Sequence, residues 1–85
     1  MKEQDLVDLG FERADVSEIE SGGDPFHYYT LDFARGLSLI SQASDEVVDN
    51  KLFVEVFETN PQIRFTDKKP IKELIKIITK AKINE

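Results

Sequence analysis

The chain has no cysteine and only one histidine among its 85 residues. Without cysteine it can form no disulfide, offers no thiolate nucleophile, and cannot build a cysteine-ligated zinc or iron–sulfur site. Small secreted domains often depend on such cross-links, so their absence favours a reducing compartment. We therefore expect a cytoplasmic protein that folds without covalent cross-links.

Long apolar runs are also missing. No stretch approaches the roughly 20 apolar residues that a helix needs to cross a bilayer. Residues 1–5 are polar and acidic, and no apolar signal region follows them. We expect a soluble protein with no membrane contact.

Size and composition indicate one small α+β domain, residues 1–85. A chain of this length buries only about 60–65% of its unfolded surface, so its stability should be modest. Hydrophobic residues make up 40% of the chain, including six phenylalanines and two tyrosines. That content supports one core and exceeds what is typical of a disordered chain.

The charge is divided unevenly along the chain. Residues 1–66 carry fourteen acidic and five basic side chains, a balance of −9, whereas residues 67–85 carry six lysines and three acidic residues, a balance of +3. Such a field influences which partners approach and how fast, but it defines no reaction.

Local patterns predict the elements in order. Residues 3–9 fit a short helix that Gly10 can end in the left-handed conformation. Residues 11–17 read as a short strand. Residues 18–25 read as a loop, because they contain two consecutive glycines and a proline.

Four further segments alternate as strands do. They are residues 26–33, 37–41, 51–57 and 62–65. The links between them are short or polar, and the first is a tight turn in which Gly36 can take a positive φ. Consecutive strands joined in this way predict an antiparallel meander sheet of four to five strands.

The end of the chain predicts an amphipathic helix packed on one face of the sheet. Asp67 is a candidate N-cap, and Pro70 falls in the first turn, where its missing N–H costs little. Beyond the proline, apolar side chains recur at helical spacing on one side of the helix, and lysines occupy the other side. The predicted core is Leu31, Leu37, Leu39, Val54, Val56, Phe65, Ile71, Leu74, Ile75 and Ile78.

The lysine side of this helix could bind phosphates. Its members, Lys69, Lys72, Lys76 and Lys80, are three or four residues apart. The remaining surface, however, would repel a nucleic-acid backbone. We therefore favour an ordinary solvated helix face and expect no direct nucleic-acid binding.

The excess of acidic side chains has two possible interpretations. Ordered carboxylates could imitate phosphates and occupy a basic protein groove. The other reading is ordinary solubility charge, which a net value of −6 fits well. Candidate carboxylates for mimicry are Glu12, Asp15, Glu18, Glu20, Asp24, Asp45, Glu46 and Asp49.

The sequence contains little evidence for a catalytic site or a metal site. Asp45, Glu46 and Asp49 lack the ligand spacing and central glycine of a calcium loop, so we expect no metal and no cofactor. His27 has no local nucleophile or orienting group, although Asp32 or Glu55 could approach it in the fold. The Ser21-containing glycine segment lacks the lysine and following helix of a phosphate loop. We expect no enzyme.

The sheet itself supplies the best functional clue. Its central strands carry large apolar groups on both faces, and two helices can cover only one of them. The second face would keep Phe26, Tyr28, Phe53 and Phe57 near solvent unless the long loops fold over it. Exposed apolar patches usually mark an interface.

Five segments resemble small acidic proteins of unknown function from phages and integrated mobile elements. They are residues 8–12 (DLGFE), 25–31 (PFHYYTL), 39–41 (LIS), 54–57 (VEVF) and 63–67 (IRFTD). The resemblance implies a fold and a genomic setting, and it carries no site residues.

The sequence thus predicts a non-enzymatic interaction module that binds a protein partner or a second copy of itself. It would act through the second sheet face and the acidic residues Asp45, Glu46 and Asp49. The alternatives are a nucleic-acid mimic and a small enzyme built around His27.

Overall fold

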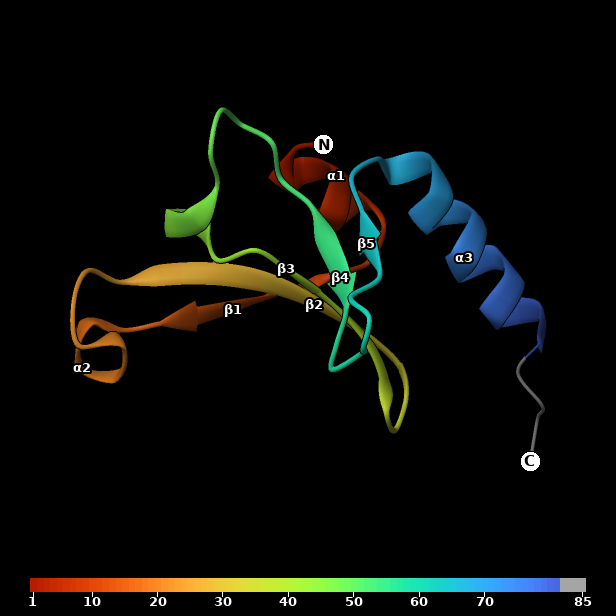
Figure 1. The fold of residues 1–85 in the computed structure, drawn as a ribbon, viewed down its shortest axis with the longest axis horizontal. Coiled ribbons are helices and arrows are strands. Elements are labelled where there is room, and N and C mark those ends of the chain that lie inside the picture. The colour runs from red at the N-terminus through yellow and green to blue at the C-terminus, as the bar shows by residue number, and fades with distance from the viewer. Residues whose placement is uncertain (82–85) are drawn as a thin grey trace.

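The computed structural model describes residues 1–81, which form an α+β fold on one five-stranded antiparallel sheet (Figure 1). The strands lie side by side in sequence order, which confirms the predicted meander. Lys82 and Glu85, counted in the charge balance, lie outside the described residues. The strands are β1 (Glu12–Val16), β2 (Phe26–Ala34), β3 (Leu37–Ser41), β4 (Val54–Val56) and β5 (Arg64–Phe65). The helices are α1 (Glu3–Asp8), α2 (Glu18–Ser21), the 3₁₀ turn η1 (Ser44–Glu46) and α3 (Lys68–Ala81).

The first sheet face carries the core, and α1 packs on it. Tyr29, Leu39 and Val54 point to this face from β2, β3 and β4, and all are at least 95% buried. Leu6 of α1 and Phe11, which follows it, pack against them. The fully and nearly buried side chains are Leu6, Phe11, Tyr29, Leu39, Leu52, Val54 and Ile71.

Gly10 brings α1 and β1 onto the same core. Its φ of 100° lies in the region that favours glycine. The Gly10 N–H bonds to the Val7 carbonyl and the Phe11 N–H bonds to the Leu6 carbonyl, each at 3.0 Å, as in a Schellman motif. The predicted helix stop is therefore confirmed, and it places Leu6 and Phe11 in contact with the same cluster.

The predicted core was incomplete and wrong at one position. Leu37 is 37% exposed because it pairs with Ala34 beside the β2–β3 turn, after a register shift in β2. Ile78 is half-buried but lies outside the main cluster. The other predicted members are buried or pack against the core. The buried residues Leu6, Phe11, Tyr29 and Leu52 were not predicted.

The predicted loop over residues 18–25 is wrong for its first four residues, which form α2. Ser17 caps this turn. Its hydroxyl accepts the Glu20 N–H at 3.3 Å and donates to the Glu20 carboxylate at 3.2 Å. Gly22 then ends the turn with a φ of 74°. The cap and the glycine together make a single exposed helical turn.

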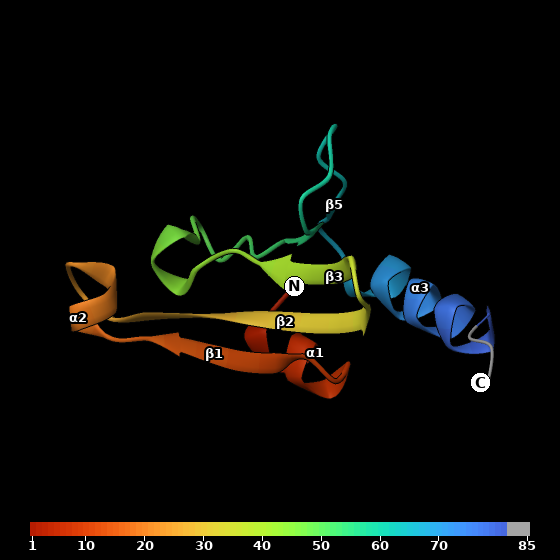
Figure 2. The same cartoon turned by 90° about the horizontal axis from the view of Figure 1, so that it is seen from below.

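The last two strands are shorter than predicted. Val54–Val56 pairs with β3, and Phe53 and Phe57 each add only one backbone bond at its ends, to Gln42 and Ser38. The chain then turns at Glu58, whose φ is 58°. The sheet is therefore narrow on this side, and the link between β4 and β5 stands out from it (Figure 2).

Helix α3 packs through its first half only. Ile71 is fully buried, and Leu74 and Ile75 pack against the core cluster. The helix then runs beyond the end of the sheet (Figure 1), and Ile77 is 63% exposed. Lys68 Nζ also lies 3.5 Å from Asp5 Oδ1 and links α3 to α1.

Candidate functional site

The second sheet face, which we call the open face, is not covered by a helix. Strand pairing places Tyr28, Thr30, Ile40 and Glu55 on it, because Thr30 lies opposite Ile40 and Ile40 lies opposite Glu55. In Figure 2, no helix lies in front of β1, β2 and β3. As expected from the sequence, the helices cover only one face of the sheet. The other face therefore remains accessible.

A groove of about 430 Å³ lies on the open face. Its apolar lining comes from Tyr28, Ile40, Phe53 and Phe57, on β2, β3 and the two ends of β4. Phe57 is half exposed. A hollow of this size lined by aromatic groups can hold apolar side chains of a partner.

The rim of this groove is acidic. Glu46 of η1, Glu55 of β4 and Glu58 of the β4–β5 turn all line it. Arg64 offsets one of them, because its Nη2 and Nε lie 2.8 and 3.1 Å from the same Glu55 oxygen. Within residues 1–81, Glu46 and Glu58 form no ion pair, so the rim keeps two negative charges.

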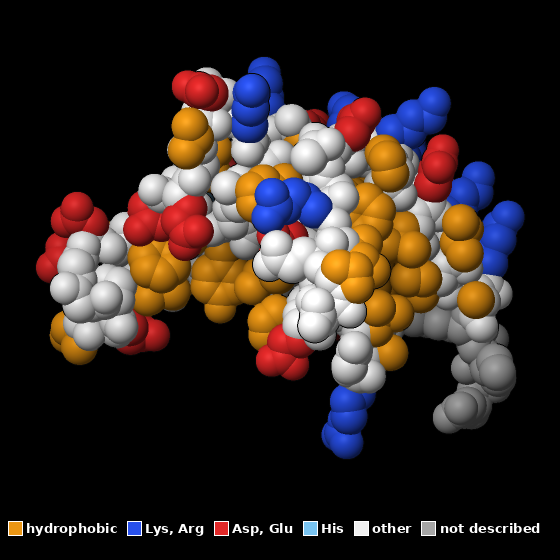
Figure 3. Space-filling view, viewed as in Figure 1, with side chains coloured by type: hydrophobic (Ala, Val, Ile, Leu, Met, Phe, Trp, Pro, Cys, Tyr) orange, Lys and Arg blue, Asp and Glu red, His pale blue; other side chains and the backbone are white. Residues whose placement is uncertain are grey.

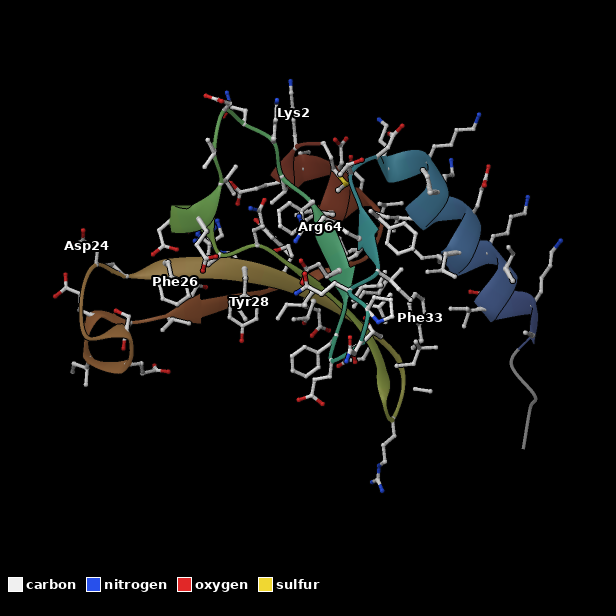
Figure 4. All side chains as sticks on the ribbon, in the orientation of Figure 1. Lys2, Asp24, Phe26, Tyr28, Phe33 and Arg64 are labelled. Atoms are coloured by element: carbon white, nitrogen blue, oxygen red, sulfur yellow. The ribbon has the colours of Figure 1, made fainter. Side chains whose placement is uncertain are left out.

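Arg64 also packs over Phe53, one of the residues that line the groove. Its guanidinium carbon lies 3.9 Å from the centre of the Phe53 ring, a cation–π contact. The side chain therefore bridges Phe53 and Glu55 across two strands (Figure 4). The two contacts restrain the Phe53 ring and the Glu55 carboxylate.

Two serine hydroxyls fix the other wall of the groove. Strand β2 extends past the end of β3, and its N–H groups there need other acceptors. The Tyr29 N–H bonds to Ser41 Oγ at 2.8 Å, and the His27 N–H bonds to Ser44 Oγ at 3.0 Å. The Ser44 bond holds η1, and with it Glu46, alongside β2.

The structure brings together four of the seven predicted interaction residues. Tyr28, Phe53, Phe57 and Glu46 line the groove. Phe26 lies beside Tyr28 on the same side of β2 (Figure 4). The remaining two are exposed and do not line the groove. They are Asp45 and Asp49.

Several further groove residues were not proposed from the sequence, among them Ile40, Glu55 and Glu58. Ile40 had a usable signal, since Leu39 was assigned to the core and its neighbour must face the other way. Glu58 had no such signal, because its position depends on how the β4–β5 turn folds.

His27 lies on the core face, and its partner is neither Asp32 nor Glu55. Its Nε2 contacts Glu3 Oε1 of α1, and the same oxygen accepts the Tyr29 hydroxyl at 3.0 Å. The adjoining cavity has only about 10 Å³ of space, which is too small for a substrate. The arrangement therefore ties α1 to β2.

The Glu3 contact predicts a pH effect on stability. The hydrogen bond from His27 is the main cause that lowers the pKa of the Glu3 carboxyl from 4.5. A lowered folded-state pKa stabilises the fold above the unfolded pKa, and this contribution is lost as pH falls through the folded value. Urea unfolding midpoints should fall less for Glu3→Gln than for the parent protein between about pH 5 and pH 3.

The effect should be small, because the Glu3 side chain is 51% exposed. Glu12→Gln removes the same charge from an exposed position on β1 and serves as the control. Equal pH profiles for the parent and Glu3→Gln would show that this contact contributes nothing to stability.

The described part of the chain contains neither a cluster of metal ligands nor a membrane-spanning helix. Within residues 1–81, no group of three or more histidine, aspartate or glutamate side chains is placed to hold a metal ion. Over the same residues, no helix has the length and apolar character required to cross a membrane.

Comparison with known proteins finds no matching family model, curated protein or solved structure.

Proposed function

We propose that the protein is a non-enzymatic interaction module whose open-face groove binds a protein partner. One observation carries the proposal: an aromatic groove with an acidic rim lies on a sheet face that no helix covers. The partner would insert apolar side chains between Tyr28, Ile40 and Phe57 and present basic groups to the rim. The sequence resemblance suggests an accessory or inhibitory role in a phage-like element.

A displayed library of random peptides tests the groove while its natural partner is still unidentified. Selected peptides should combine aromatic or aliphatic residues with lysine or arginine. Phe57→Ser should weaken their binding about tenfold or more, since it removes a large apolar contact. Ile19→Ser is the matched control, because Ile19 is 95% exposed on α2 and lies away from the groove.

Two results would contradict the proposal. One is a selection that yields no binding peptides. The other is a set of peptides that bind Phe57→Ser and Ile19→Ser as well as they bind the parent protein. Tyr28→Ser tests the opposite side of the groove in the same way.

Nucleic-acid mimicry is the second candidate. Acidic side chains gather over α2 and η1 at one end of the molecule (Figure 3), including Glu18, Glu20, Asp45 and Glu46. Binding by mimicry should weaken steeply as salt rises, whereas binding through an apolar groove should change much less. Titrating a captured partner at several salt concentrations separates the two.

A further inference from the structure

The outer half of α3 carries a charge opposite to that of the groove rim. The helix carries five lysines and one glutamate. Lys76 and Lys80 are exposed one helical turn apart, and Ile77 beside them is itself 63% exposed. This half of the helix extends beyond the sheet, and Figure 3 shows its lysines along the outer edge of the molecule.

The charges of the two surfaces are complementary. At about 1.5 Å per residue, Lys76 and Lys80 are separated by roughly 6 Å along the helix, so they lie about one turn apart. The rim of the groove carries Glu46 and Glu58, which are negatively charged. Ile77 would meet the apolar lining beside this rim.

We infer that the groove binds α3 of a second copy of this chain. Ile77 inserts among Tyr28, Ile40 and Phe57, while Lys76 and Lys80 approach Glu46 and Glu58. Each copy has one helix and one groove, so two copies can satisfy both contacts in a closed two-fold dimer. The inference rests on the proposed function, because it uses the same groove.

Charge reversal provides the decisive test. One variant carries Lys76→Glu and Lys80→Glu, and the other carries Glu46→Lys and Glu58→Lys. All four positions are exposed, so both variants should fold. Light scattering over a concentration series should show a dimer for the parent and at least about tenfold weaker association for each variant alone.

Mixing the two variants should restore the dimer. In the mixed pair each helix again meets a groove of opposite charge, so both contacts recover together. Ile77→Ser should weaken association about tenfold or more without changing the far-UV circular dichroism spectrum. Ile19→Ser, on the exposed turn α2, should leave association unchanged.

The inference is overturned by a parent protein that stays a single chain at every concentration. It is also overturned if the mixed variants associate no better than each alone, or if Ile77→Ser dimerises like the parent. Library peptides that still bind a single-chain parent, and lose binding in Phe57→Ser, would leave the proposed function standing. Failure of both experiments would remove both proposals.

Discussion

Ile71→Ala is expected to lower the free energy of unfolding by about 2–5 kcal/mol and the melting temperature by at least about 10 °C. Ile71 is fully buried and is the main anchor of α3 on the core cluster. A chain of this size has a total stability near the lower end of about 5–15 kcal/mol, so the loss is a large share of it. Thermal melting followed by circular dichroism measures the change.

Ile77→Ala is the matched control for this prediction. It makes the same substitution on the same helix, at a position that is 63% exposed. At high dilution, where association does not contribute, its effect should stay within about 0.5 kcal/mol. Similar melting curves for the two variants would contradict the placement of α3 described above.

Ser41→Ala should destabilise the fold by about 1–3 kcal/mol, although it removes only one oxygen atom. Ser41 is 6% exposed, and its hydroxyl is the acceptor for the Tyr29 N–H beyond the end of β3. The substitution leaves that buried N–H without a partner. It should also loosen the end of β3, where Ser41 lines the groove.

Urea denaturation gives the stability change, and Ser38→Ala is the control. Ser38 lies on the same strand, but its hydroxyl donates to the Asp32 carboxylate at an exposed position. Hydrogen exchange should show faster exchange of the Tyr29 amide in Ser41→Ala. An unchanged rate would mean that the Ser41 bond is not needed to protect this amide.

The sheet was predictable because its signals are local. Alternation in residues 26–33 separated Tyr29 and Leu31 from Phe26 and Tyr28, and the structure keeps this division. The turn at Gly36 was equally clear, and its φ is 86°. Patterns of this kind depend on neighbouring residues, so they can be read without knowing the rest of the fold.

The missed features have different causes. The α2 turn did have a local signal, since Ser17 followed three residues later by glutamate is a capping box, but the glycines after it favoured a loop. The His27–Glu3 contact had none, because it joins positions 24 residues apart through the packing of α1. Predicting the groove would have required knowledge of both the strand register and the path of the β4–β5 turn.

The strict sequence order of the strands bears on how the chain reaches this fold. Each strand pairs with its neighbour in the sequence, so the sheet can grow by closing one loop between neighbouring strands at a time. The core makes a different demand, because Leu6 and Ile71 belong to the same cluster although they lie near opposite ends of the chain. Once the sheet has formed, it shortens the flexible chain between α1 and α3, so the contact that is most distant in sequence can form last at a low loop-closure cost.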